Sequence, residues 1–170
     1  NGILTEYLKT KGLEENTQGL VYFAVSKKGE APIDGKTDTN PEGLTAVTGK
    51  WGDDMAARLA KADLACKVLD KDTWTVAMLE KHIWICAFMA VGSQYEGCTV
   101  GGVEKDHNAE VREIIGELAA AASWETGVSF TDDLGDRLCA YARSVAHFPT
   151  ALKEFEWRNG WFADITLKRA

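Results

Sequence analysis

The first third of the chain has the pattern of a small sheet. Two runs of β-branched and aromatic residues, 19–29 and 44–49, are each bounded by glycines, which is typical of strands. The polar segment 30–43 between them contains the turn signals Asp34-Gly35 and Asn40-Pro41. We therefore expect two antiparallel strands joined by a long surface loop.

Short helices flank this pair. Residues 4–13 have apolar positions on one side and reach a glycine at Gly12, so they predict a short helix. Asp53 or Asp54 can cap a second helix, whose apolar face repeats at helical spacing. Residues 65–70 (ACKVLD) then favour one more short strand.

Beyond residue 72 the pattern is helical only. Asp72 or Thr73 can cap a long helix over 74–93, which is apolar nearly all round except at 80–82 and is therefore expected to be central and buried. The spacing at 111–122 predicts a second helix, and that at 134–145 a third, opened by Thr131 or Asp132. Residues 97–102 (GCTVGG) are expected to form a loop.

Pro149 suits the first turn of a fourth, short helix over 150–157, which Gly160 would end. The complete pattern predicts an α+β fold that is mainly α. Residues 1–72 form its α/β portion and residues 73–170 an all-α bundle. A chain of 170 residues with 45% hydrophobic content can bury a core of its own.

Charge and hydropathy exclude two classes of partner. The net charge of -7 and the absence of a clustered basic face argue against nucleic acid. The longest apolar run, 83–91, is nine residues, whereas a membrane-spanning helix needs roughly twenty. We expect no transmembrane segment, although peripheral association with a membrane stays open.

Cysteine and histidine spacing gives no sign of a metal site. Cys66, Cys86, Cys98 and Cys139 stand far apart with no CxxC, which favours reduced thiols in a reducing compartment. The three histidines have no ligand spacing to one another or to a cysteine, so we expect surface or capping roles and no bound metal. These histidines are His82, His107 and His147.

Neither glycine-rich stretch has the spacing of a phosphate loop. In 43–51 five residues separate the glycines where four are needed, and Trp51 stands where a Ser or Thr would hold magnesium. The stretch 97–102 is not GxGxxG and follows a helix rather than a strand.

Lys81 lies in an otherwise apolar helix, where a lysine must extend to solvent, pair with an acid or act in a cleft. One interpretation is a solvent-facing stripe with Glu80. The other is a lysine that points into a cleft between the two portions and donates to a carbonyl oxygen or hydroxyl of a substrate.

The segment 147–162 (HFPTALKEFEWRNGWF) combines a hydroxyl, charges and many aromatic side chains. Thr150 can satisfy a free amide in a first helical turn, and the aromatic residues can pack in the core. The same density also suits a surface for a protein partner. The candidate interface residues are Phe148, Phe155, Trp157, Arg158, Trp161 and Phe162.

The order of these parts resembles ketopantoate reductase (2-dehydropantoate 2-reductase) and the related dehydrogenases with a helical C-terminal domain, as in 6-phosphogluconate dehydrogenase. Three short motifs carry the resemblance. Asn1-Gly2-Ile3 is similar to the Asn-Gly turn after the fifth strand of the family's dinucleotide fold, 79–84 (LEKHIW) to its lysine element, and 150–154 (TALKE) to its serine segment. Residues 1–72 would then be the rear half of the dinucleotide-binding domain.

The resemblance implies roles for particular residues. Lys81 would give a proton to the reduced carbonyl, Asn1 would hold the substrate, and Thr150 would contact it. Two departures replace polar residues of the family by apolar ones, at Ile85 and Phe162. The glycine-rich loop for NADPH would lie before Asn1, so we expect no cofactor in this form and NADPH only if a front half is present.

These features predict a non-catalytic, ketopantoate-reductase-like accessory subunit of a larger protein assembly. The wording of 147–162 is similar to plant and algal relatives, which implies a plastid setting, in the stroma or at the stromal face of a membrane complex. The alternative is an NADPH-dependent 2-oxo acid reductase of which this chain is the C-terminal two-thirds. The sequence has no initiator Met or leader, so we expect it to begin inside a longer or processed protein.

Overall fold

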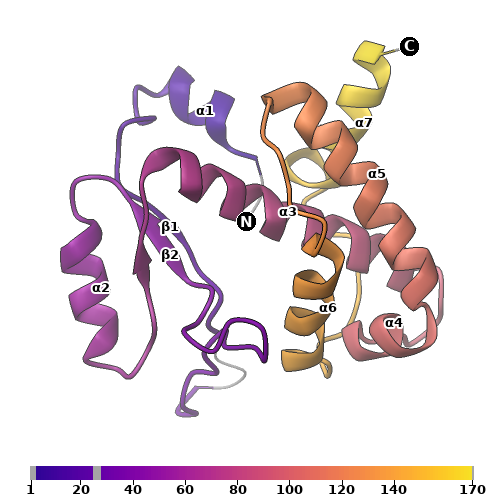
Figure 1. Cartoon of the computed structure of the whole chain (residues 1–170), viewed down its shortest axis with the longest axis horizontal. Helices are drawn as coiled ribbons and strands as arrows, with labels where there is room; N and C mark the ends of the chain where they lie inside the picture. The colour runs from indigo at the N-terminus through magenta and orange to yellow at the C-terminus, as the bar shows by residue number, and fades with distance from the viewer. Residues whose placement is uncertain (1–2, 25–27, 170) are drawn as a thin grey trace.

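The computed structural model describes residues 3–24 and 28–169, and Asn1 lies outside them. In these residues a small three-stranded sheet and a bundle of helices share one long central helix, α3 (Lys71–Gly92). Figure 1 shows α3 running from the sheet on the left into the bundle on the right. The fold is α+β and mainly α, as the sequence predicts.

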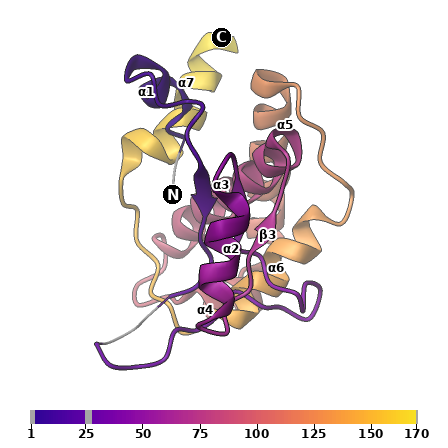
Figure 2. The same ribbon diagram turned by 90° about the vertical axis from the view of Figure 1, so that its left-hand side faces the viewer.

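The front of the chain contains α1 (Thr5–Thr10), β1 (Gln18–Leu20), β2 (Ala46–Thr48), α2 (Gly52–Ala60) and β3 (Lys67–Val68). β1 is antiparallel to β2, with Gln18 opposite Thr48, and β3 is parallel to β2 on its other side. All three residues of β2 are buried. The strand packs against both α2 and α3, and α2 covers the face away from the bundle (Figure 2).

The antiparallel pair is confirmed, but β1 is much shorter than the run 19–29. The ladder ends because the amide of Tyr22 donates to Oγ1 of Thr45, at 3.0 Å, instead of to a backbone carbonyl. Ala24 and Ile33 then form only an isolated antiparallel bridge across the loop.

α3 is buried because its apolar residues surround most of its circumference. Its cap is Asp70, which accepts from the amide of Thr73 at 2.9 Å, so the prediction of Asp72 or Thr73 as the cap was wrong by two or three residues. By length and hydropathy alone α3 could cross a membrane. However, 61% of its most apolar window is buried inside the protein, as in the core helix of a folded domain.

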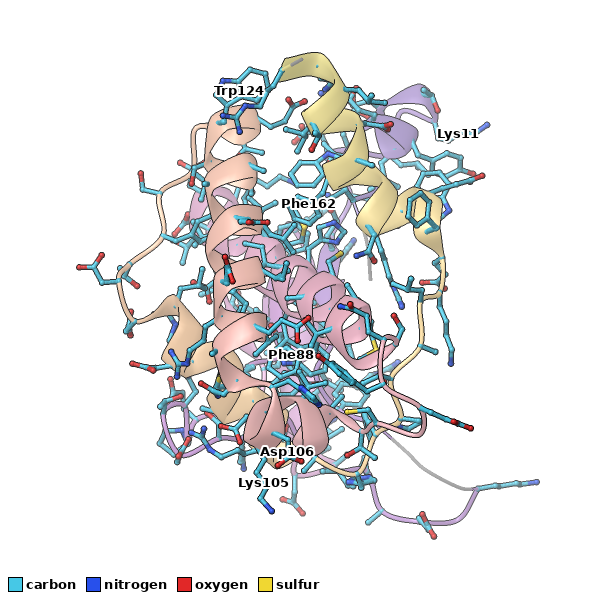
Figure 3. All side chains as sticks on the ribbon, turned by 90° about the vertical axis from the view of Figure 1, so that its right-hand side faces the viewer. Lys11, Phe88, Lys105, Asp106, Trp124 and Phe162 are labelled. Atoms are coloured by element: carbon cyan, nitrogen blue, oxygen red, sulfur yellow. The ribbon has the colours of Figure 1, made fainter. Side chains whose placement is uncertain are left out.

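Four further helices form the bundle. They are α4 (Val100–Asp106), α5 (Asn108–Thr126), α6 (Leu134–Ser144) and α7 (Asn159–Arg169), with a 3-10 turn η1 (Phe155–Trp157) before α7. α3 contacts α4, α5 and α6, and α7 packs on α5. Figure 3 shows Phe88 in the centre of the bundle and Phe162 between α5 and α7. The predicted helices at 111–122 and 134–145 are confirmed as α5 and α6.

Two of the predicted helix starts are shifted. α2 begins at Gly52, so Asp53 and Asp54 lie in its first turn and do not cap it. α6 begins at Leu134 with Asp133 at the cap position, not at Thr131 or Asp132. In both helices no side chain accepts a capping hydrogen bond.

The loop predicted at 97–102 is wrong, because α4 starts within it. Thr99 caps α4 by accepting from the amide of Gly102 at 3.2 Å. Gly101 allows α4 to approach the chain at Ala146, since a Cβ on this glycine would overlap that residue. The glycines therefore serve helix packing, which the sequence pattern did not distinguish from loop flexibility.

The predicted helix over 150–157 is also wrong. Pro149 forms an isolated bridge with Thr99, and Thr150 donates its amide and its hydroxyl to the carbonyl of Cys98, at 3.3 and 2.8 Å. These bonds hold the segment extended up to η1. Gly160 does not end a helix; it is the second residue of α7, where a Cβ would meet the carbonyl of Phe155.

Candidate functional site

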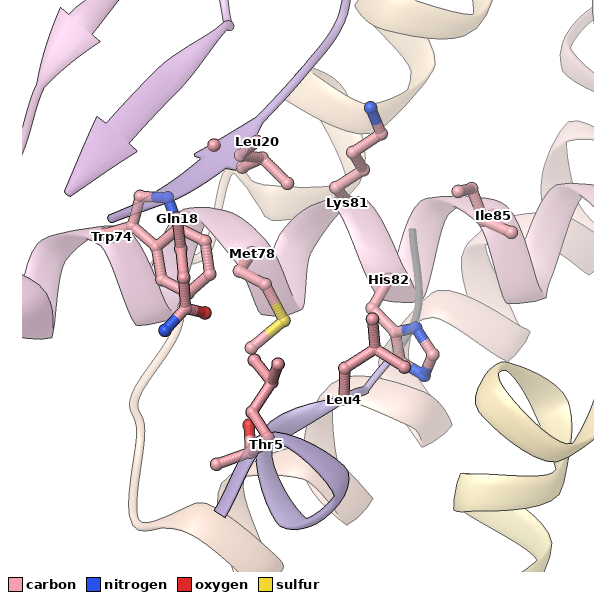
Figure 4. A pocket seen from close by; sticks show the side chains of 11 residues that line it. Leu4, Thr5, Gln18, Leu20, Trp74, Met78, Lys81, His82 and Ile85 are labelled. Atoms are coloured by element: carbon pink, nitrogen blue, oxygen red, sulfur yellow. The ribbon is translucent and has the colours of Figure 1, made fainter. Parts of the chain in front are cut away.

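Lys81 is the only charged residue among the buried polar residues that the structure describes, and 6% of it is exposed. Its ammonium donates to the carbonyl oxygen of Val21 and lies 4.0 Å from the ring centroid of Tyr22. Figure 4 shows Lys81 leaving α3 on the side of Leu20, away from Met78 and His82. The helix therefore places the lysine against the chain that follows β1.

Burial changes the acid–base properties of this ammonium. Loss of solvation lowers the pKa of Lys81 from 10.5 to about 8, and the nearby charge of Arg158 acts in the same direction. A lysine with such a pKa is protonated at neutral pH and can still give its proton away near pH 8. This is the behaviour expected of a proton donor in a cleft.

A cavity of about 300 Å³ lies beside Lys81, between the chain after β1, α3, α6 and the segment before α7. We call it the Lys81 cleft. Its charged lining residues are all cationic, whereas the whole protein has a net charge of -7. The residues that line it are Val21, Tyr22, Phe23, Ala24, Lys81, Trp84, Ile85, Met89, Tyr141, Phe148, Pro149, Ala151, Lys153 and Arg158.

Arg158 has a free hydrogen-bond donor at this cleft. One of its terminal nitrogens pairs with Glu154 at 2.7 Å, but its Nε is buried and has no partner in the described part of the chain. Only 15% of the Arg158 side chain is exposed. Lys153, which is exposed, adds a third positive charge. A small carboxylate would match these charges, because ionised acceptors make the strongest bonds to guanidinium and ammonium groups.

A second pocket, of about 190 Å³, lies on the other side of Lys81 under α1. Figure 4 shows Leu4, just before α1, and Thr5, its first residue, facing Met78 and His82 of α3 across it. His82 was expected at the surface or at a helix end, but only 2% of it is exposed. The expectation was wrong because the ring is covered by Trp161 and Phe162, with ring centroids at 5.5 and 5.2 Å.

His82 and Cys86 lie close together, with Nε2 3.9 Å from Sγ, and they could be taken for a nucleophilic pair. Burial lowers the pKa of His82 to about 4 and raises the pKa of the Cys86 thiol to about 12. Both groups are therefore neutral around pH 7. A thiolate nucleophile needs the opposite shifts, so this pair is structural.

Glu80 and Lys81 do not share a solvent-facing stripe. Glu80 pairs with Arg137 of α6 on another side of α3, beside a hollow of about 700 Å³. The hydroxyls of Thr73, Thr75 and Thr126 in that hollow already donate to other protein atoms. These three hydroxyls therefore serve the fold.

The residues predicted from the sequence do not all meet in one place. Ile85 lines the Lys81 cleft one helical turn beyond Lys81 and is buried. Thr150 lies beside Gly92 in a separate shallow pocket, while its neighbours Pro149 and Ala151 line the cleft. Asn1 lies outside the described residues, so its predicted role stays a prediction.

The six candidate interface residues do not form one exposed surface. Phe155 is 58% exposed and Trp157 is 38% exposed, and Tyr7 contacts Trp157 edge to face at 5.8 Å. Phe148, Arg158 and Trp161 are half-buried, and Phe162 is a core residue that no partner could reach. Arg158 was predicted as an interface residue and not as a neighbour of Lys81, because no local pattern says which cations converge on a lysine some seventy residues earlier.

Two glycines of the stretches tested as phosphate loops lie in close packing contacts. A Cβ at Gly49 would meet the backbone of Thr17, and one at Gly101 would meet Ala146, so both glycines are used in packing. Likewise no group of His, Cys, Asp and Glu residues suited to a metal ion occurs in residues 3–24 and 28–169. Gly49 and Gly101 therefore serve packing contacts of the fold.

The short sheet leads into a helical bundle through one long buried helix, and this arrangement is similar to part of two ketopantoate reductases. Two solved structures have this fold. The PanE/ApbA family ketopantoate reductase from Ralstonia eutropha JMP134 matches 99% of this chain at a TM-score of 0.69 and 20% identity. The 2-dehydropantoate 2-reductase from Methylococcus capsulatus matches 99% at a TM-score of 0.71 and 17% identity.

The chain spans 58% and 57% of the lengths of these two proteins. At such identities the likeness shows the fold and leaves the chemistry to the residues of this chain. No protein-family model matches the sequence. No curated protein matches it either. The resemblance deduced from the order of the motifs is confirmed at the level of fold.

Proposed function

We propose that this chain binds a small 2-oxo acid in the Lys81 cleft and supplies the proton for its reduction, as the acid-binding part of an NADPH-dependent reductase. One observation carries the proposal: a buried lysine with a pKa of about 8 faces a cavity whose only charges are positive. The fold that the chain shares with the two reductases supports the same reaction class.

The cleft residues suit the two ends of such a substrate. The carboxylate would lie against the cationic side chains of Arg158 and Lys153. The carbonyl oxygen would then accept from Lys81, which uses one of its three N–H groups on Val21. As the carbonyl becomes an alcohol, negative charge grows on this oxygen and Lys81 would transfer its proton there.

A reduced nicotinamide would supply the hydride in such a reaction. Because the described residues offer it no phosphate cradle, it would have to be held elsewhere. The part assigned to this chain is to orient the acid, keep its reacting end away from water and hold a proton at Nζ of Lys81. Burial of that nitrogen lowers its pKa to about 8, which is close to neutral pH.

Binding and turnover test the proposal. Ketoisovalerate titrated into the chain by calorimetry should bind saturably, and Arg158→Gln should weaken it about tenfold or more. In the protein expressed from its complete gene, Lys81→Met should lower NADPH consumption with the acid by about 10²- to 10⁴-fold. Lys168→Met, on the surface of α7, is the control. Absence of binding, or undiminished turnover in Lys81→Met, would refute the proposal.

A second candidate is a non-catalytic accessory subunit, favoured by the exposed pair Phe155 and Trp157 and by the apolar Ile85 beside Lys81. Exposed aromatic residues of this kind are frequent anchors of protein interfaces. Recovery of a protein partner that is lost in the double variant Phe155→Ser, Trp157→Ser and kept in Trp124→Ser, together with no acid binding, would favour it. Trp124 is equally exposed but lies at the far end of α5.

A further inference from the structure

The Lys81 cleft has a charged end and an apolar end. Lys81, Ile85 and Met89 follow one another at four-residue spacing, so they line one face of α3 over about 12 Å. The positive charge of Arg158 lowers the pKa of both Lys81 and Cys86. The guanidinium therefore lies near the first turn of this face. The positive potential is therefore concentrated at the Lys81 end.

The other end of the cleft offers almost no polar group. Met89 faces Phe148, Pro149 and Ala151, and the amide of Ala151 is already directed at the sulfur of Met89, at 3.5 Å. Trp84 and Tyr141 pack together, with ring centroids 4.6 Å apart, and Tyr141 contacts Tyr22, so this aromatic pair lies nearer to Lys81. The lining contains no Ser, Thr, Asn or Gln side chain among the described residues; its uncharged polar side-chain groups are the hydroxyls of Tyr22 and Tyr141 and the indole N–H of Trp84.

We infer that the acid held in this cleft carries an apolar, branched or aromatic side chain without a hydroxyl group, which lies along Ile85 and Met89. The inference rests on the proposed function and specifies its substrate class. A hydroxyl placed beside Met89 and Phe148 would meet no uncharged polar side chain there, whereas a methyl or phenyl group would gain contact with both residues.

A matched pair of acids tests this directly. Trimethylpyruvate and ketopantoate differ by one hydroxyl on one methyl group. Calorimetric titration should give tighter binding of trimethylpyruvate, by about 5- to 150-fold. Along pyruvate, ketobutyrate and ketovalerate, each added methylene should raise the affinity about fourfold.

A variant locates the side chain of the acid. Ala151→Leu would fill the apolar end from a segment outside the helices, so it should lower the ratio of ketoisocaproate to pyruvate affinity. Ala163→Leu, on the exposed side of α7, should leave the ratio unchanged. Circular dichroism would confirm that both variants fold.

The outcomes separate the inference from the proposed function. Saturable binding that favours trimethylpyruvate and falls in Ala151→Leu supports both. Binding of ketopantoate as tight as or tighter than that of trimethylpyruvate overturns the apolar substrate class, while the acid site itself stands. If none of the acids binds, the proposed function fails and the inference fails with it.

Discussion

At the scale of single residues, Lys81 is the group on which the chemistry depends. The sequence singled it out because a lysine in an apolar helix needs an explanation, and it left a solvent-facing and a cleft-facing interpretation open. The structure buries the ammonium against Val21 and Tyr22, next to a cationic cleft. Burial of the ammonium destabilises the folded state, because the bond to the Val21 carbonyl and the contact with the Tyr22 ring only partly replace the lost hydration.

This burial predicts a specific pH dependence of stability. The unfolded chain keeps the Lys81 proton up to its ordinary pKa of 10.5, whereas the folded chain releases it above about 8. Between these values the unfolded state binds more protons, so the folded state gains stability as the pH rises. Relative to Lys81→Met, the wild type should gain about 3 kcal/mol between pH 7 and pH 10.5 in urea unfolding.

Subtracting the free energy of unfolding of Lys81→Met from that of the wild type cancels the contributions of the other lysines and the tyrosines. Below pH 8 the difference should be constant, because Lys81 is then charged in both states. A difference that stays flat across the whole range would mean that the lysine is solvated.

Other site residues could not have been predicted one by one. Arg158 and Lys153 reach the cleft from a segment that is extended only because Thr150 bonds to Cys98 and Pro149 pairs with Thr99. These contacts join positions about fifty residues apart. No local pattern carries that information, so the sequence could not show that Arg158, predicted as an interface residue, lies at the same cleft as Lys81.

At the scale of elements, the long periodic segments and the short elements of the first third were predicted correctly, whereas α4 and α7 were not. α3, α5 and α6 have enough turns for their apolar spacing to be unambiguous. α4 has seven residues and two glycines, and its helical state depends on the cap at Thr99 and on packing at Ala146. α7 was missed because Gly160 was interpreted as a helix end.

The cap of α4 can be tested by Thr99→Ala. Removing the acceptor for the amide of Gly102 should lower the free energy of unfolding by about 1 kcal/mol. Thr75→Ala is the matched control, because the Thr75 hydroxyl only bonds back to Lys71 within α3 and alanine suits a helix interior. Urea unfolding should show a loss in the first variant alone, and equal effects would exclude a capping role.

Close packing of α3 against the segment before α7 gives a second test at this scale. Gly92→Ala puts a Cβ into the side chain of Thr150 and should destabilise the fold by about 1–3 kcal/mol. Gly116→Ala, in α5 with no neighbour near its Cβ, should stabilise it by about 1 kcal/mol through helix propensity. Thermal unfolding should move the two midpoints in opposite directions; a stabilised Gly92→Ala would contradict the contact.

At the scale of the whole molecule, the arrangement explains why a cleft exists at all. α3 belongs to both portions, so the sheet with the chain after β1 and the bundle with the segment before α7 are held on either side of Lys81. Each motif is weak alone, but the order and spacing of the elements predicted the fold that the chain shares with the two reductases. Order and spacing persist when single residues change. The division at residue 72 stays a prediction, since α3 packs on both sides of it.

The central claim is that an acid binds beside the protonated Lys81. An anion placed there must raise the pKa of Lys81 from about 8, so binding at pH 8 should draw a proton from the buffer. Ketoisocaproate titrated calorimetrically in two buffers of different ionisation enthalpy measures this uptake. We expect it to approach about half a proton per acid at pH 8, to fall towards zero at pH 6 and to vanish in Lys81→Met. Binding with no proton uptake, or with uptake that persists in Lys81→Met, would contradict the account.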